Sequence, residues 1–112
     1  MPAAPNLLCH YVSGSVTLAA ATATPKTFPT GGARVVTVVV KNTGSTNNIT
    51  AISYNVAPLA NLYGADTAIS SGLPITPGNS LRFSIVDEAA SEAKVTVTST
   101  SGTTCQIEAG GR

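Results

Sequence analysis

Apolar and polar side chains alternate with a period of two along most of this chain, and no other feature constrains its fold as strongly. The segment 33–41, ARVVTVVVK, places Val36, Val38 and Val40 on one side of an extended chain. Successive side chains of a β-strand point to opposite faces, so this spacing predicts a strand. Its other side carries two further valines, and we therefore expect it in the middle of a sheet, little exposed on either face.

The same period recurs in other segments rich in β-branched residues, which favour strands. Clusters of Gly, Pro, Asn and Ser, such as TPKTFPTGG (24–32), separate them about every ten residues and predict turns. The pattern predicts an all-β chain, a single antiparallel β-sandwich, Ig-like or jelly-roll-like, of about seven strands. The expected core-facing residues are Thr50, Ile52, Tyr54 and Val56 in 48–56, Leu81, Phe83 and Ile85 in 80–87, Val95 and Val97 in 93–100, Cys105, Ile107 and Ala109 in 103–109, and Val16, Leu18 and Ala20 in 15–22.

Only two segments have a composition that suits a helix. VAPLANLYGADTA (56–68) contains Pro58 and Gly64, which interrupt helices, and DEAASEA (87–93) is long enough for one turn. Neither is large enough to form a domain, and 112 residues suffice for one core. We expect an N-terminal arm with a short edge strand over 1–14 and the sandwich domain over 15–112.

The low content of charged residues limits the kinds of partner that the chain can bind. Charged residues make up 10% of the chain and the net charge is +1, which gives no field to attract nucleic acid or an anionic membrane. No run reaches the 18 or so apolar residues of a membrane helix, and the first residues lack the pattern of a secretory signal. A neutral surface rich in Thr, Ser, Asn and Gly suits a protein that works outside cells or inside an assembly. We expect synthesis in a cytoplasm without export by the general pathway.

The titratable residues carry no catalytic signature. His10 is the only histidine, so neither a nucleophile–base pair nor a zinc site with clustered ligands is expected. Asp87, Glu88 and Glu92 are interpreted as a solvated turn rather than a calcium or acid–base site. No glycine-rich phosphate loop occurs. We expect no enzyme activity, no metal and no cofactor.

The two cysteines, Cys9 and Cys105, fall in the first and last strand-like runs. First and last strands often lie side by side in sandwiches, and a bridge between them would close a loop of about one hundred residues. Free buried cysteines are also common. The sequence leaves three states open: an intramolecular disulfide, two free thiols, or a bond between subunits.

The segments VTVVVKNTGSTNNITAISYNV, LPITPGNSLRFSI and AKVTVTSTSGT together resemble the Ig-like β-sandwich modules of bacterial surface proteins and of phage virion accessory proteins. In those modules a strand runs into an Asn-Thr-Gly turn, and a Gly-x-Ser step leads into a following strand. The resemblance implies a structural virion protein, a capsid decoration or cement protein that binds across capsomers. Its partners would be the major capsid protein or other virion subunits, and it would form a homo-oligomer, with a trimer as one option. The alternatives are a subunit of an extracellular filament or surface layer, or a phage tail or fibre component.

Three segments are candidates for contact with such partners. Each combines apolar side chains with a sequence that has no obvious strand partner, and the arm is favoured because its prolines prevent a helix while its leucines offer apolar anchors. The candidate interface residues are Pro2, Pro5, Leu7 and Leu8 in the arm, Phe28 in the loop 24–32, and Leu59, Leu62 and Tyr63 in the segment 58–68.

Overall fold

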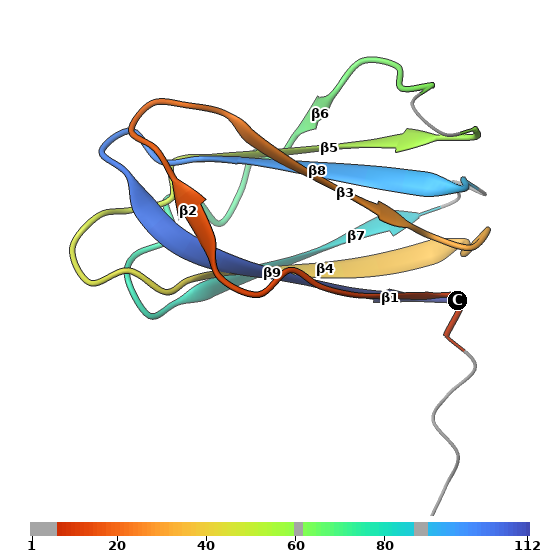
Figure 1. The fold of residues 1–112 in the computed structure, drawn as a ribbon, viewed down its shortest axis with the longest axis horizontal. Helices are drawn as coiled ribbons and strands as arrows, with labels where there is room; N and C mark the ends of the chain where they lie inside the picture. The colour runs from red at the N-terminus through yellow and green to blue at the C-terminus, as the bar shows by residue number, and fades with distance from the viewer. Residues whose placement is uncertain (1–6, 60–61, 87–89) are drawn as a thin grey trace, which may run out of the picture.

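The computed structural model describes residues 7–59, 62–86 and 90–112. Within these ranges the chain forms nine strands and no helix, and the strands build two sheets packed face to face (Figure 1). The predicted all-β sandwich is confirmed, with nine strands where about seven were expected. The strands are β1 (Cys9–Val12), β2 (Val16–Leu18), β3 (Thr24–Pro29), β4 (Val35–Asn42), β5 (Ala51–Ala57), β6 (Thr67–Ala68), β7 (Ser80–Val86), β8 (Glu92–Thr98) and β9 (Thr103–Gly111).

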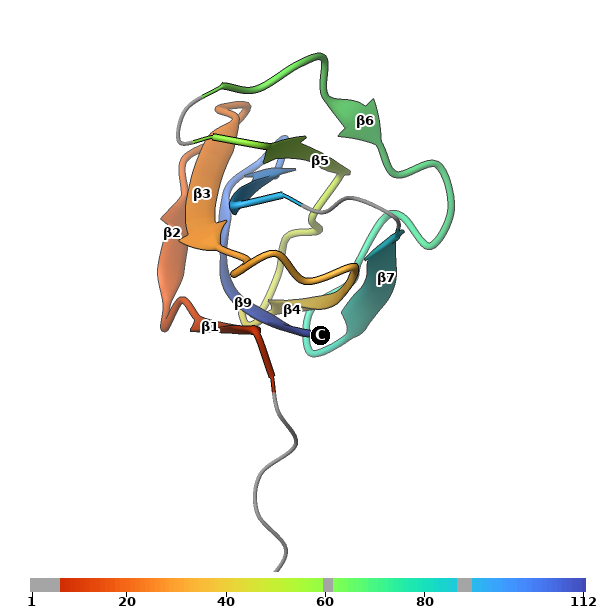
Figure 2. The same ribbon diagram turned by 90° about the vertical axis from the view of Figure 1, so that its right-hand side faces the viewer.

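The order of the strands identifies the type of sandwich. The larger sheet has the order β1-β9-β4-β7, with β2 also paired to β9, and the smaller sheet has the order β3-β8-β5-β6. Because β1 and β2 follow one another along β9, they act as one broken first strand. The first strand then pairs with the last, β3 with β8, β4 with β7 and β5 with β6, all antiparallel. This nested pairing is that of a jelly roll. Figure 2 shows the two layers end-on.

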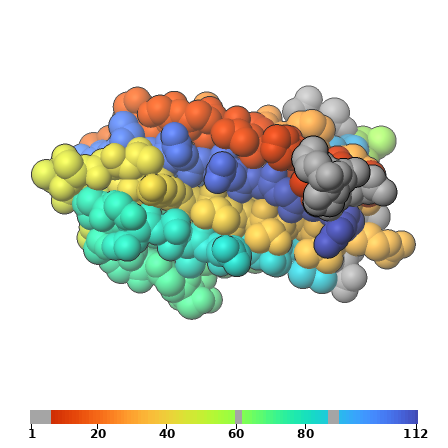
Figure 3. Space-filling view, turned by 90° about the horizontal axis from the view of Figure 1, so that it is seen from below, coloured from red at the N-terminus to blue at the C-terminus, as the bar shows by residue number. Residues whose placement is uncertain are grey.

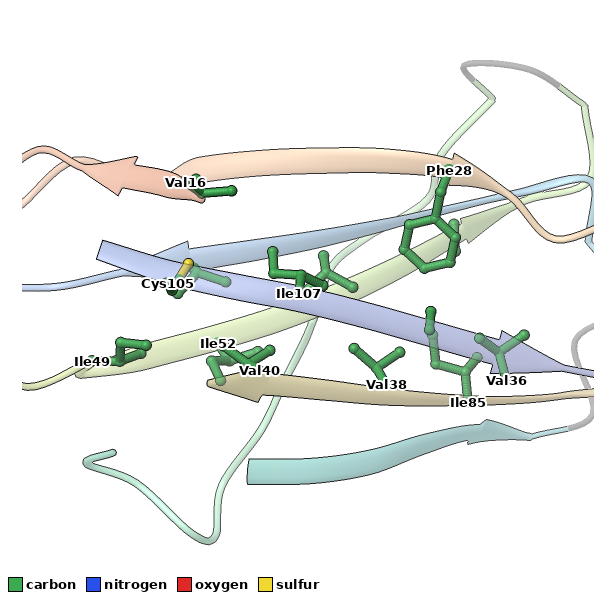
Figure 4. Close-up of a cluster of buried hydrophobic side chains, with 14 of the residues drawn as sticks. Val16, Phe28, Val36, Val38, Val40, Ile49, Ile52, Ile85, Cys105 and Ile107 are labelled. Carbon is green, nitrogen blue, oxygen red and sulfur yellow. The ribbon is translucent and has the colours of Figure 1, made fainter. Parts of the chain in front are cut away.

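The core fills the space between the sheets (Figure 4). Val36, Val38 and Val40 of β4 are at most 2% exposed, and β4 lies between β9 and β7, as predicted for a central strand. The expected burial of its other face is wrong, because the two sheets pack only on the inner side and leave Val35 and Lys41 exposed. The expected inward faces of β7, β8 and β9 are confirmed, because each alternates between less and more exposed residues in the predicted phase. One-sided burial explains why a period of two was sufficient to find them.

The segment 24–29, predicted to be part of a turn, is instead the edge strand β3. The 3.0 Å bond from the Thr30 N–H to the Ser91 carbonyl shows that the main-chain groups of the even-numbered residues bond β8. The main-chain groups of Pro25 and Pro29 therefore point to the free edge of the sheet. A proline lacks the N–H that an inner strand needs, but it is tolerated where that N–H would face solvent. Phe28 is correspondingly buried in the core, 2% exposed, and its ring stacks on Tyr11 at 4.7 Å between centroids.

Two details near other strands also differ from expectation. Ala20 is exposed rather than core-facing, because β2 ends at Leu18 and the chain turns at Ala21, whose φ is +55°, toward the smaller sheet. Thr50, which was expected to face the core, is exposed. Ile49, the residue before it, was expected on the opposite face and is fully buried. The strand begins only at Ala51, and Ile49 forms a separate bridge with Ile75.

The segment 56–68 is not helical where it is described, and it ends in the two-residue strand β6. Of the other segment expected to suit a helix, residues 87–89 lie outside the described residues, and Glu92 and Ala93 belong to β8. Pro58 and Gly64 disfavour a helix in the first case. Pairing with β5 and β3 on both sides fixes the start of β8 as a strand.

Asn42 ends β4 with a buried amide whose four hydrogen bonds are all made. Its Nδ2 donates to the carbonyl oxygens of Asn47 at 2.8 Å and Ile75 at 2.9 Å. Its Oδ1 accepts from the N–H of Gly44 and from the hydroxyl of Thr103, both at 3.0 Å. The Asn-Thr-Gly turn singled out in the sequence thus joins three separate segments of the chain.

Candidate interaction surface

The outer face of the larger sheet carries side chains that the strand register aligns in rows across the strands. Val35 of β4 pairs with Val86 of β7 and exchanges two main-chain hydrogen bonds, of 3.1 and 3.2 Å, with Arg112. Because alternate residues point to the same face, the outward rows follow at every second position. In order they are Arg112, Val35 and Val86, then His10, Gly110, Thr37 and Ser84, and then Val12, Glu108, Val39 and Arg82. Leu7 lies beside Gly110 and borders the same face, whereas Leu8 lies against Gly31.

Exposed apolar side chains gather on this face, which Figure 3 shows from outside, with the bands of β9, β4 and β7 side by side. In the described part of the chain seven large hydrophobic residues are exposed, and four of them belong to it. Single exposed hydrophobic residues need no explanation, whereas a group of them marks a contact site. We call this group the apolar face: Leu7, Val12, Val35 and Val86.

The middle row forms a shallow groove across the strands because Gly110 has no side chain and the side chains of Thr37 and Ser84 are small. Gly110 and Thr37 line two adjoining hollows of about 320 and 400 Å³. The first hollow reaches His10, Val39 and Arg82. The second hollow is bordered by Leu7, Val35 and Arg112. The groove lies within the apolar face and offers room for a side chain of a bound partner.

Charges on this face are mainly positive. Lys41, Arg82 and Arg112 are exposed and point outward from the larger sheet or its end, and Glu108 is the acidic residue among the same rows. The face therefore has an excess of two positive charges in a chain whose net charge is +1. Two copies of such a face repel one another, and an acidic surface is attracted.

A second candidate region lies on the outer face of the smaller sheet. We call residues 58–59 and 62–66 the strap. The Tyr63 hydroxyl donates a hydrogen bond to Glu92, and Lys94 Nζ lies 4.7 Å from the centre of the Tyr63 ring and 3.6 Å from Asp66 Oδ1. Asn55 Nδ2 donates to Asp66 at 2.8 Å. Burial, and then the neighbouring Glu92, raise the pKa of Tyr63, which stays a hydrogen-bond donor.

The predicted contact residues separate into different groups. Leu7 belongs to the apolar face, and Leu8 is exposed beside Gly31, whereas Phe28 is a core residue and is withdrawn as a contact candidate. Leu59 and Leu62 are exposed on the strap, 68% and 59%, while Tyr63 is half-buried and contacts the chain's own sheet. Pro2 and Pro5 lie outside the described residues.

The register rules out a disulfide between the cysteines within this chain. Cys9 pairs with Gly111, while Cys105, on the neighbouring strand, pairs with Val16. Six residues of β9 therefore separate the two rungs, about 20 Å at the rise of a strand. A bridge needs Cα atoms within about 7 Å. Both thiols are free and fully buried, and burial raises the pKa of Cys9 and raises that of Cys105 to about 11.

The remaining titratable candidates are dispersed. His10 is exposed at one end of the groove, and Glu92 accepts the bond from Tyr63. Asp87 and Glu88 lie outside the described residues. Over 7–59, 62–86 and 90–112, no three His, Cys, Asp or Glu side chains lie close enough to hold a metal ion. Within the same ranges the chain has no helix with the length and apolarity that crossing a membrane requires.

Val12, Val35 and Val86 were not singled out as contact residues from the sequence. They come from three different strands, and only the pairing of β1 and β4 with β9 and of β4 with β7 brings them onto one face. The signal available in the sequence was their position on the outward side of their strands. A single apolar residue at such a position is ordinary, so the position alone does not distinguish a contact residue.

Comparison with known proteins gives a similarity in structure only. No protein-family model and no curated protein matches this chain. A chain in the solved structure of infectious bursal disease virus, Gx strain, is similar over 92% of this chain, with 11% sequence identity and a TM-score of 0.35. This chain spans 30% of the length of that viral chain.

Proposed function

We propose that this protein is a structural, non-catalytic subunit of a virus particle, and that it binds the outer shell across neighbouring capsomers as a decoration or cement protein. The observation that supports this most is that, among the described residues, four of the seven exposed large hydrophobic side chains gather on one face of the larger sheet. A jelly roll is common among viral capsid domains, but the same fold occurs in lectins and cupins, so the surface carries the argument rather than the fold.

The apolar face gives moderate affinity from each copy. Covering a half-exposed Val or Leu contributes about 1 kcal/mol, so four such residues contribute about 4 kcal/mol. Association costs at least about 4 kcal/mol in lost freedom of motion. A single copy would therefore bind weakly, and firm attachment needs several contacts at once. A shell with repeated binding sites supplies them.

The charges indicate which surface on the shell fits. Arg82 and Arg112 flank the groove. An acidic patch on the major capsid protein, with an apolar side chain at its centre, would match both the charge and the hollow above Gly110. Oppositely charged partners bind faster at low salt, so binding should weaken as the salt concentration rises.

The test is co-sedimentation with particles purified from the organism that encodes the chain. Mass spectrometry should find the protein in the particle fraction. Recombinant protein should rebind, and Val35→Thr/Val86→Thr, which keeps shape and strand preference, should weaken rebinding about 30-fold, the equivalent of about 2 kcal/mol. The matched control, Leu59→Ser/Leu62→Ser, removes the exposed leucines of the strap and should rebind like the wild type.

Different outcomes would contradict different parts of the proposal. Absence of the chain from particles, with recovery in a fibre fraction, would favour a filament or surface-layer subunit. Loss of rebinding in the strap variant alone would move the contact from the larger sheet to the strap. Unchanged rebinding of both variants would remove the apolar face from the interface.

A further inference from the structure

The strand β7 forms an open edge of the larger sheet. It pairs with β4 on one side, and in the described part of the chain no hydrogen bond joins its other side to any group. It is seven residues long and contains neither proline nor lysine. In Figure 3 it forms the lower border of the sheet. A long edge of this kind is a template for pairing with another strand.

The register shows which main-chain groups are free. Val35 and Arg112 bond each other, so the odd-numbered residues of β4 bond β9 and the even-numbered ones bond β7. The 2.9 Å bond from Asn42 N–H to the Asn79 carbonyl belongs to the same set. The N–H and C=O groups that point away from β4 are therefore those of Ser80, Arg82, Ser84 and Val86, and all four residues are exposed.

The other edges of the two sheets are blocked or short. On the first edge of the larger sheet, Gly14, with φ of +69°, lies in the break between β1 and β2. On β3 two of the three outward positions are prolines, Pro25 and Pro29, which have no N–H to donate. The strand β6 has two residues. One edge of the four is thus both long and able to donate.

We propose that β7 pairs with β7 of a second copy, antiparallel and about a two-fold axis at Phe83. In this register Arg82 lies opposite Ser84 of the second copy and Ser80 opposite Val86 of the second copy. Each of these four residues exchanges its N–H and C=O groups across the axis, and no two like charges stand directly opposite. The two larger sheets become one continuous sheet.

The side chains on the inner face of β7 support the same arrangement. Leu81 and Phe83 point toward the core but stay partly exposed, because they stand at the open side of the sandwich. Phe83 stacks on Tyr54 at 5.7 Å between ring centres, which holds its ring near the edge. The axis brings Phe83 beside Phe83 of the second copy, at the separation of direct cross-strand neighbours, and so covers both rings. A second copy, rather than a strand of unrelated sequence, is favoured because this register opposes neither like charges nor prolines.

Sedimentation of the purified full chain tests this inference without any shell protein. The wild type should change from 11.2 kDa to a dimer of twice that mass between low micromolar and submillimolar concentration. Ser84→Pro removes an N–H that points away from β4, so the fold should persist by circular dichroism while dimerisation weakens roughly 100-fold. Ser84→Ala keeps the N–H and should dimerise like the wild type.

A wild type that stays monomeric throughout, or a Ser84→Pro protein that dimerises as well as Ser84→Ala, would overturn the inference. If the proline variant fails to fold, hydrogen exchange of the wild-type segment 80–86 decides. Its outward amides should exchange more slowly at high protein concentration than at low concentration, whereas equal rates would refute the pairing. None of these results depends on whether the protein binds a virus particle.

Discussion

Replacing Asn42 by alanine should be among the most destabilising single changes at a polar residue of this protein. The side chain is fully buried, and its amide joins the end of β4 to three other main-chain groups and the Thr103 hydroxyl. Asn42→Ala removes all four hydrogen bonds. The buried carbonyl oxygen of Ile75 loses one of its two donors and keeps the Ile49 N–H at 3.0 Å.

The size of the effect follows from these contacts. A hydrogen bond contributes about 1 kcal/mol net, so the four bonds together contribute about 4 kcal/mol. Asn47 and Gly44 are only partly buried, so water replaces part of what they lose. We therefore expect a loss of about 3 kcal/mol in the free energy of unfolding. With an unfolding entropy of roughly 0.24 kcal/mol/K for a chain of this length, the Tm falls by about 13 °C.

Thermal and urea unfolding followed by circular dichroism would measure both quantities. The matched control is Asn79→Ala, because Asn79 is exposed and its amide donates to the Thr76 hydroxyl at the surface. That change should cost less than about 1 kcal/mol. A Tm of Asn42→Ala within about 3 °C of the wild type would refute the reasoning, since it would mean that the network adds no net stability.

Two further predictions test the packing of β9 and its neighbours, one on the reactivity of the cysteines and one on substitutions at Gly110 and Gly111. With a pKa of about 11, only about one Cys105 thiol in a thousand is ionised at pH 8, so Cys9 and Cys105 should resist iodoacetamide until the protein unfolds, and then both should react whether or not reductant was present. Labelling of one cysteine or none after unfolding without reductant would contradict two free thiols. At Gly111 an added Cβ would meet the Val35 carbonyl oxygen, so Gly111→Ala should cost about 2 kcal/mol in a urea titration. At Gly110 the nearest atom is 3.9 Å away, and Gly110→Ala should stay within about 0.5 kcal/mol of the wild type. Equal stability of the two variants would contradict the close approach of β4 to Gly111.

The strands with one buried face were predictable from the sequence, and the edges were not. Val36, Val38 and Val40 gave the core face of β4 because burial on one side imposes a period of two. Phe28 was misassigned because Pro25 and Pro29 are typical of a turn, and only the pairing of β3 shows that both prolines face a free edge.

The candidate site was predictable only in part, for a related reason. Leu7 and Leu8 are apolar residues in an arm without a strand partner, so the sequence singled them out. Val35 and Val86 become part of the same surface as Leu7 through pairing between strands about fifty residues apart. Of the three states left open for the cysteines, the intramolecular bridge does not fit the structure. Neighbouring strands do not specify neighbouring residues, and register depends on the whole ladder.

The prolines of β3 also bear on how this protein stays dissolved. A net charge of +1 provides almost no repulsion between molecules, and a β-rich chain with open edges would be prone to stack into insoluble fibres. At Pro25 and Pro29 the missing N–H groups limit such growth where charged side chains would do so in other proteins. This protection against fibre growth depends on missing main-chain N–H groups and not on charge. We therefore expect it to persist at high salt, where repulsion between charges is screened.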